Sequence, residues 1–239
     1  MIYIMSDIHG LYSRYTAMLK KIDLQDEDKL YVLGDVIDRG PQSFEILEDI
    51  MNRKNTEMFL GNHEHMMLTY LEGSDTESWF YAQNGGKETY QKFMGFSEEK
   101  QKAITDYLKY DTTIIRHLNV NGHHYVLSHT SALTDIGDMF TKDYADNLMY
   151  VQNIVWNMLY DSVDSIPSKE KSPEEIILIS GHIITRRLAE SDEVFIRKYP
   201  NNYTWMDIDC GCAVGGSFGY LSCVEINDEG VISNIHYVK

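Results

Sequence analysis

Five short apolar segments of this chain each end beside a residue type that can bind a metal ion. Short apolar runs bounded by glycine and polar residues are typical of buried strands. In open α/β sheets, ligands collect outside the carboxyl ends of such strands. The segments and their residues are Ile2–Met5 with Asp7 and His9, Leu30–Leu33 with Asp35, Glu57–Leu60 with Asn62, Tyr125–Leu127 with His129, and Ile176–Ile179 with His182. The pattern predicts an α/β fold with one metal centre.

Helical patterns alternate with these segments in the first half of the chain. The spacing of apolar residues predicts one helix after Gly10, a second that opens at Pro41, and a third over Glu64–Leu71. Residues 74–110 form a predicted helical insertion, with a turn at Asn84-Gly85-Gly86. Each of the first three helices begins just after a ligand motif, so its positive end favours anions at the site.

The second half of the chain is predicted to contain more strand. A hairpin is expected about Asn121-Gly122, residues 131–175 are polar and predicted to be irregular, and residues 203–239 are rich in predicted strands. No linker separates the candidate ligands, so we expect a single domain over residues 1–239. The expected architecture is two packed mixed sheets flanked by helices, with the metal site at the carboxyl ends of the strands.

Composition excludes several classes of partner. The formal net charge of -16 and the pI of about 4.8 argue against a nucleic-acid partner, which would require a basic patch. The chain has no apolar run near the ~20 residues that span a bilayer, so no membrane partner is predicted. Cys210, Cys212 and Cys223 are an odd set crowded into one segment, which we interpret as small core residues of a reduced, cytoplasmic protein.

The candidate ligands are oxygen and nitrogen donors without a thiolate. This set suits manganese, iron or zinc and excludes a structural cysteine-type zinc site. Asp35 offers two oxygens and could bridge two ions, and ions ~3.5–4 Å apart would activate a shared water and clamp phosphoryl oxygens. His63 could protonate a leaving oxygen while Asp38 holds its ring, and Arg39 offers a planar fork for phosphate. Glu64 is interpreted as a structural capping residue.

Three strings in the first third of the chain resemble the signature of the phosphoprotein phosphatase family, within the calcineurin-like metallophosphoesterases. They are S-D-I-H-G at 6–10, G-D-V-I-D-R-G at 34–40 and G-N-H-E at 61–64, and Ser128-His129 and Gly181-His182 match the two later histidine motifs. The resemblance covers roughly residues 1–225. It implies a central β-sandwich flanked by helices, and the Asn84-Gly85-Gly86 segment is more similar to short bacterial and phage members.

Carried over by position, the resemblance implies two divalent metal ions, with manganese favoured and iron or zinc as alternatives. Asp7, His9 and Asp35 resemble the ligands of the first ion. The second ion would take Asp35, Asn62, His129 and His182, with Asp35 bridging. His63 and Asp38 match the acid pair, and Arg39 matches a phosphate-binding arginine.

One departure from the family pattern concerns substrate binding. Members commonly carry Trp-x-Arg where this chain has Trp156-Asn157-Met158, and a methionine side chain cannot donate a hydrogen bond. Arg186 or Arg187 could bind the phosphate instead, and Arg116 is a weaker alternative.

The resemblance implies a metal-dependent phosphomonoesterase, in the first place a serine/threonine protein phosphatase, in which a bridging metal hydroxide attacks phosphorus. Its partner would be a phosphorylated protein or a small phosphoester. The alternative is a symmetrical bis(5'-nucleosyl)-tetraphosphate hydrolase, although those relatives tend to lack an acid at Asp38 and to have Asp at Glu64. A lesser alternative, motivated by Met158, is a metal-binding regulatory module with weakened catalysis. The sequence does not specify the physiological substrate or the oligomeric state.

Overall fold

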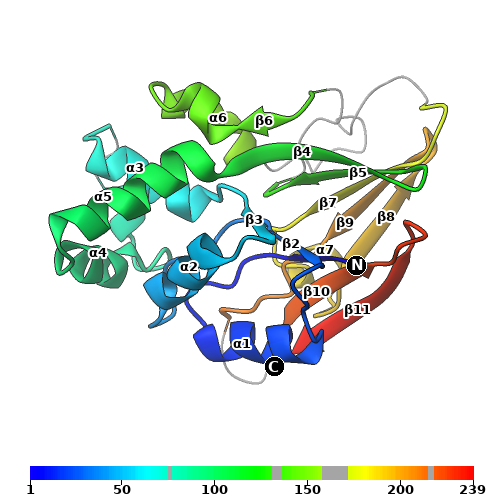
Figure 1. Cartoon of the computed structure of the whole chain (residues 1–239), viewed down its shortest axis with the longest axis horizontal. Helices are drawn as coiled ribbons and strands as arrows, with labels where there is room; N and C mark the ends of the chain where they lie inside the picture. Colours follow the sequence, from blue (N-terminus) through cyan, green and yellow to red (C-terminus); the bar gives the residue numbers. More distant parts are fainter. Residues whose placement is uncertain (75–76, 131–135, 158–171, 215–217) are drawn as a thin grey trace.

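Two packed β-sheets form the centre of the protein in a computed structural model that describes all residues except 75–76, 131–135, 158–171 and 215–217 (Figure 1). In the first sheet the strand order is β11-β10-β1-β2-β3. In the second it is β6-β4-β5-β7-β9-β8. The strands are β1 Ile2–Met5, β2 Lys29–Val32, β3 Thr56–Met58, β4 Thr113–Val120, β5 His123–Ser128, β6 Met139–Phe140, β7 Ile176–Ser180, β8 Phe195–Tyr199, β9 Tyr203–Asp207, β10 Leu221–Ile226 and β11 Ile232–Val238.

Each sheet contains a run of three parallel strands. In the first sheet β1 pairs in parallel with β2, and β2 with β3. In the second, β5 pairs in parallel with β7, and β7 with β9. Parallel strands end at the same edge of a sheet, so the residues that follow these six strands are gathered at one edge of the sandwich.

Alternation along the strands divides the apolar side chains between two layers of core. Ile4 of β1 and Ile179 of β7 belong to the cluster between the sheets, with Leu33, Leu127 and Met206. Tyr3 and Met5, which flank Ile4, belong to the larger cluster that includes the helices. Because successive side chains of a strand point to opposite faces, both faces of the first sheet are covered. The two-sheet sandwich predicted from the sequence is confirmed.

Helices lie outside the sheets, and several gather at one end of the molecule (Figure 1). They are α1 Tyr12–Lys21, α2 Ser43–Asn52, α3 Asn62–Leu71, α4 Gly86–Met94, α5 Glu98–Asp106, α6 Leu148–Val155 and the short α7 Arg186–Ala189, with single turns η1 Ser78–Phe80, η2 Tyr107–Asp111 and η3 Thr141–Tyr144. None of the helices in the described part of the chain has the length and apolar character needed to span a membrane.

The boundaries of two helices differ from the prediction. Helix α2 begins at Ser43 and not at Pro41, because the preceding segment is tied to the loop after β1, where Gln42 N donates to Gly10 O over 3.0 Å. Helix α3 begins at Asn62, two residues earlier than predicted. The carboxylate of Glu64 accepts a hydrogen bond from Gly61 N over 3.0 Å, which fixes that start.

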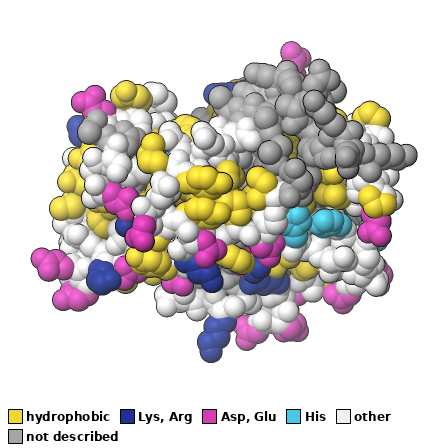
Figure 2. All heavy atoms as spheres, turned by 90° about the horizontal axis from the view of Figure 1, so that it is seen from above, with side chains coloured by type: hydrophobic (Ala, Val, Ile, Leu, Met, Phe, Trp, Pro, Cys, Tyr) yellow, Lys and Arg dark blue, Asp and Glu magenta, His cyan; other side chains and the backbone are white. Residues whose placement is uncertain are grey.

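The described part of residues 131–175 is more regular than predicted. It contains β6, η3 and α6. Leu148, Val151 and Val155 are buried on one face of α6, at a helical spacing. Met149 and Tyr150 are about half exposed on the other face, at 50% and 58%. Figure 2 looks down on this side of the molecule, where apolar side chains lie among acidic ones.

The predicted hairpin is present. Strands β4 and β5 are joined by Asn121 and Gly122, both with positive φ, at 49° and 87°. Two consecutive residues of this kind match the twist of the strands they connect.

Candidate metal centre

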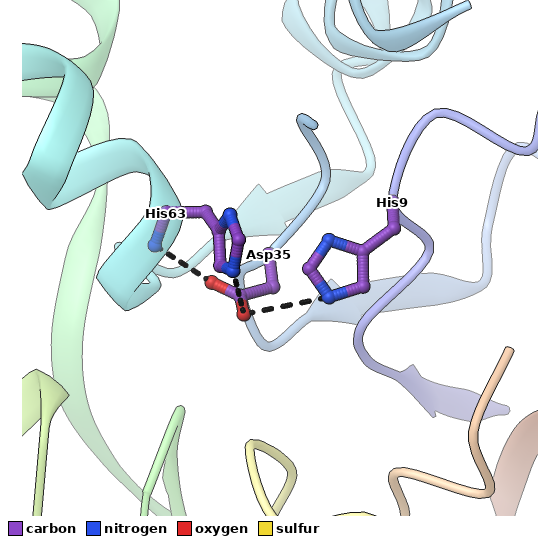
Figure 3. Close-up of side chains that lie close together, drawn as sticks. All are labelled: His9, Asp35 and His63. Carbon is purple, nitrogen blue, oxygen red and sulfur yellow. Dashed lines mark hydrogen bonds and ion pairs between the residues drawn. The ribbon is translucent and has the colours of Figure 1, made fainter. Parts of the chain in front are cut away.

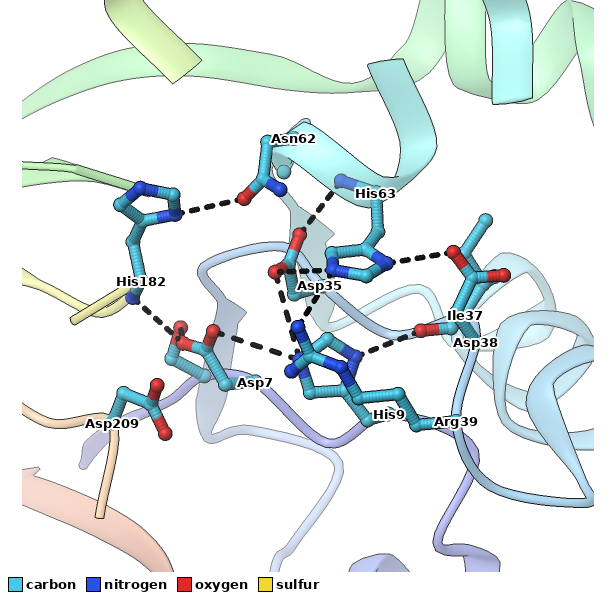
Figure 4. Close-up of polar contacts among 12 residues, drawn as sticks. Asp7, His9, Asp35, Ile37, Asp38, Arg39, Asn62, His63, His182 and Asp209 are labelled. Atoms are coloured by element: carbon cyan, nitrogen blue, oxygen red, sulfur yellow. Dashed lines mark hydrogen bonds and ion pairs between the residues drawn. The ribbon is translucent and has the colours of Figure 1, made fainter. Parts of the chain in front are cut away.

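The six parallel strands each end at a polar side chain that faces the same site. Asp7, Asp35 and Asn62 follow β1, β2 and β3 of the first sheet. His129, His182 and Asp209 follow β5, β7 and β9 of the second. Asp7, Asp35, Asn62, His129 and Asp209 are all at most 4% exposed. The sequence-predicted ligands are therefore brought together, four of them from the first sheet and two, His129 and His182, from the second (Figure 4).

The carboxylate of Asp35 lies at the centre of the group. Its Oδ2 is 3.6 Å from His9 Nε2 and 3.8 Å from His63 Nε2 (Figure 3). Its Oδ1 accepts a hydrogen bond from His63 N over 3.0 Å and lies 3.5 Å from His129 Nε2. Two sets of potential ligand atoms share this carboxylate, namely His9, Asp35 and His63, and Asp35, His129 and His182. This is the arrangement that a bridging ligand requires.

Asn62 supplies the oxygen of the second set. Its Oδ1 is 2.9 Å from His129 Nε2 and 2.8 Å from His182 Nδ1. Donor atoms bound about 2.1 Å from one ion at right angles are about 3 Å apart, so these separations are those of neighbouring ligands. Asp7 is close to both sets, since its Oδ2 accepts from His182 N over 3.1 Å and its Oδ1 is 4.0 Å from His9 Nε2.

Backbone carbonyls set the orientation of two imidazoles. We assign Nδ1 of His9 as the donor to Ile37 O at 2.9 Å, and Nδ1 of His129 as the donor to Leu33 O at 2.7 Å. Nε2 of each ring is then an unprotonated nitrogen that faces the site. Hydrogen bonds of this kind orient metal-ligating histidines in proteins. Burial holds the pKa values of both rings well below their usual range, so the nitrogens are available at neutral pH.

Charge at the site favours a cation. Burial raises the pKa values of Asp7 and Asp35 well above their usual range, and neighbouring carboxylates, Asp209 for Asp7 and Asp7 for Asp35, raise them further. The guanidinium of Arg39 lies among these groups and donates to Nε2 of both His9 and His63, the latter over 3.0 Å. Buried carboxylates and lone pairs that converge on one place fit divalent cations, with oxygen and nitrogen ligands and no thiolate.

The backbone at the site is held in an uncommon conformation. Of the ten non-glycine residues with positive φ in the described part of the chain, six are sequence-predicted site residues: Asp7, His9, Asp35, Asp38, Arg39 and His182. Such residues persist only where the surrounding structure determines them. For the Asp35 loop that support is Glu64, whose buried carboxylate accepts from the backbone N–H groups of Asp35, Val36 and Ile37 over 2.8–3.1 Å. The capping role expected of Glu64 extends to this loop.

His63 and Asp38 form a buried pair beside the metal centre. Nδ1 of His63 and Oδ2 of Asp38 are 2.7 Å apart, and Nε2 of His63 points toward Arg39 and Asp35 (Figure 4). Burial raises the pKa of Asp38 to about 7. Burial, followed by the positive charge of Arg39, lowers the pKa of His63. The pair can therefore share a proton next to the place where a substrate would bind.

The structure separates the candidate phosphate-binding arginines. Arg187 lines a cavity of about 400 Å³ together with Arg39, His9 and Asp209. The guanidinium of Arg186 instead pairs with Asp192 at 2.6 Å and lies over the ring of Phe218, so the structure does not bring it into this cavity.

Arg116 pairs with Glu57 and Asp138, both at 3.0 Å, and does not line the cavity either. Met158, the position of the departure from the family pattern, lies outside the described residues.

Asp209 was not predicted from the sequence. It follows β9 in the same way as Asp7 follows β1, and Gly211 N donates to its Oδ1 over 2.9 Å. Burial raises its pKa to about 6, against the opposing charges of Arg39 and Arg187. The same sequence signal is present here, because Asp207-Ile208-Asp209 follows the strand residues 203–206.

Comparisons with known proteins agree with this geometry. Residues 1–210 match the family described as calcineurin-like phosphoesterase. A symmetrical bis(5'-nucleosyl)-tetraphosphatase of Buchnera aphidicola is 36% identical over 74 residues, 30% of this chain and only 27% of that protein. Serine/threonine-protein phosphatase 2 of Salmonella typhimurium is 27% identical over 190 residues, 77% of this chain and 79% of that protein. In fold, the chain is similar to a metallophosphoesterase from Sphaerobacter thermophilus, with a TM-score of 0.57 and 15% identity over 100% of this chain and 88% of that one.

Proposed function

Because the chain belongs to the calcineurin-like phosphoesterase family, we propose that it is a metal-dependent phosphomonoesterase that acts on phosphoserine or phosphothreonine in proteins. The family uses a dinuclear divalent metal site. In this chain Asp7, His9 and Asp35 would hold one ion, and Asp35, Asn62, His129 and His182 the other. We propose manganese as the favoured metal. Residues 1–239 would form one domain, because the candidate ligands come from both sheets.

The observation that supports this substrate class is the pair of His63 and Asp38. An alkoxide, the leaving group of a phosphorylated serine or threonine, is strongly basic and must be protonated as it leaves. Cleavage of a phosphoanhydride releases a phosphate oxygen that is stable as an anion at neutral pH. A buried imidazole that a carboxylate orients at 2.7 Å can supply a proton, which the alkoxide leaving group needs and the phosphate leaving group does not.

Each residue at the site then has a defined task. When bound, two divalent cations would lower the pKa of a water and neutralise charge on the phosphoryl oxygens. Arg39 and Arg187 would hold phosphoryl oxygens from the cavity that they both line. The negative charge of that phosphoryl group would raise the pKa of His63 from its low value, so that Nε2 carries the proton for the leaving oxygen.

The test compares His63→Ala with the wild type on two substrates. On a phosphoserine peptide, turnover should fall at least about a hundredfold, since general acids contribute about 10²–10⁴. On dinitrophenyl phosphate, whose leaving group needs no proton, turnover should change far less. Metal content, measured by mass spectrometry, should stay the same. Equal losses on both substrates would contradict the role of His63 as an acid.

A second candidate is hydrolysis of dinucleoside tetraphosphates. It is favoured by the name of the Buchnera aphidicola relative, although the matched stretch covers 27% of that protein. Direct assay of the manganese-loaded protein on a phosphopeptide and on diadenosine tetraphosphate separates the candidates. A higher kcat/KM for the dinucleotide would replace the protein phosphatase assignment.

A further inference from the structure

The carboxylate of Asp38 has a second partner besides His63. Its Oδ2 accepts a hydrogen bond from the indole N–H of Trp79 over 2.8 Å, as well as contacting His63 Nδ1 at 2.7 Å. Both Trp79 and Asp38 are fully buried. One oxygen of the carboxylate is therefore fixed from two directions, by the candidate acid and by a residue of the helical insertion.

From this geometry, and resting on the proposed function, we propose that Trp79 is a positioning residue of the reaction. Its indole N–H holds the carboxylate of Asp38 in the orientation that presents Oδ2 to the imidazole of His63. Without this bond Oδ2 loses one of its two fixed contacts, and the carboxylate can turn about its Cβ–Cγ bond among its remaining neighbours, His63 and Thr89, since terminal torsions of this kind are broad. The imidazole would then lose the partner that directs Nε2 toward the leaving oxygen.

The indole itself has little room to move. A Cβ on Gly86 would lie 2.4 Å from Trp79 Cδ1 and 2.5 Å from Nε1, so the backbone of Gly86 packs directly on the ring. The rings of Phe80 and Tyr70 lie against it on other sides, with centroids 5.5 and 5.7 Å away. Interdigitated interiors of this density keep side chains in one rotamer. The N–H is thus aimed at Asp38 by packing.

The turn that packs on Trp79 also packs on Arg39. A Cβ on Gly85 would lie 2.7 Å from Arg39 N, and Gly85 has a positive φ of 78°. Arg39 Nε donates to Gln83 O over 3.4 Å. Asn84 Nδ2 donates to Ser78 O over 2.7 Å and so ties the turn to η1, which contains Trp79. The Asn84-Gly85-Gly86 turn thereby aligns the phosphate-binding arginine and the acid pair together.

The test is Trp79→Phe, which keeps an aromatic ring but removes the donor. On a phosphoserine peptide we expect kcat to fall about tenfold, a part of the roughly 10²–10⁴ that a general acid contributes. On dinitrophenyl phosphate the change should be less than about twofold, because this leaving group needs no proton. The ratio of the two rates is independent of the fraction of folded enzyme. Tyr90→Phe is the matched control, since Tyr90 contacts the same aromatic cluster and should leave the ratio unchanged.

A second measurement places Trp79→Phe in the His63→Ala background. If Trp79 acts through His63, then Trp79→Phe should cause no further loss of turnover on the phosphopeptide in the His63→Ala protein. Equal losses on both substrates, or a full tenfold loss in the His63→Ala background, would overturn the role of Trp79 while leaving the phosphatase intact. A wild-type protein without phosphomonoesterase activity would instead overturn the proposed function itself.

Discussion

A methyl group added at Gly86 should displace Trp79 and so remove its hydrogen bond to Asp38 of the acid pair. Gly86 is the first residue of α4 and has no side chain between its backbone and the indole of Trp79. In Gly86→Ala the new Cβ would start 2.4 Å from Trp79 Cδ1 and needs about 3.4 Å, so one of the two groups must shift by about 1 Å. Trp79 is enclosed by other rings, and the nearest polar contact it can lose is its bond to Asp38.

The expected change in the free energy of unfolding follows from three contributions. Overpacking of a buried site costs about 1–3 kcal/mol. Loss of a hydrogen bond to a charged group costs about 1.5–3 kcal/mol. Replacing glycine by alanine in a helix returns up to about 1 kcal/mol. The sum predicts that Gly86→Ala destabilises the protein by about 1.5–6 kcal/mol, opposite in sign to the effect of helix propensity alone.

The assay is urea unfolding followed by circular dichroism, with activity on a phosphoserine peptide measured in parallel. Gly95→Ala is the matched control, because Gly95 ends the same helix with φ of −81°, and its Cβ would meet only Lys92 O at 3.2 Å and Gln91 O at 3.7 Å. This variant should stay within about 1 kcal/mol of the wild type. A Gly86→Ala protein as stable as Gly95→Ala, with full activity on the peptide, would refute the packing argument.

Two further predictions concern substrate and metal binding. Arg187→Ala should lower kcat/KM for a phosphopeptide by about tenfold or more. Arg186→Ala removes the pair with Asp192 and the contact with the Phe218 ring, both outside the cavity, and should change kcat/KM less than about twofold. Equal effects of the two substitutions would contradict the assignment. The melting temperature gained on adding manganese to the chelator-treated protein should increase from pH 5 to pH 8. The pKa values of Asp7 and Asp35 are raised in the folded protein, so their contribution to the stability of the metal-free protein is present below about pH 4 and is lost as pH rises. Cation binding requires the same carboxylates to lose their protons, so the stabilisation by manganese increases over the same range. A gain that is independent of pH would contradict this reasoning.

The positions of the candidate ligands, and their convergence, could be predicted because each lies immediately after an apolar run. A strand end is a local property of the sequence, and parallel strands bring such ends together without further information. Asp209 carries the same local signal after β9 and is predictable from the sequence on the same ground. Helix α6 also carried a signal, in the spacing of Leu148, Val151 and Val155.

Other features depend on packing that no local pattern contains. Trp79 and Asp38 are far apart in the chain, and their contact requires the helical insertion to be docked against the site. Arg186 and Arg187 are neighbours in sequence, yet only one lines the cavity with Arg39, because adjacent helical residues point in different directions. By residue type the two arginines are equivalent candidates for binding phosphate. They are distinguished only by where each side chain points from the short helix α7.

Because the candidate ligands come from both sheets, a bound cation would connect the two layers. A cation bound by both Asp35 and His129 would link the first sheet to the second. The rate constant for its dissociation would then depend on how often the two sheets separate. Substitutions deep in the interlayer core, such as at Leu33 or Met206, would then alter ion retention without touching a ligand.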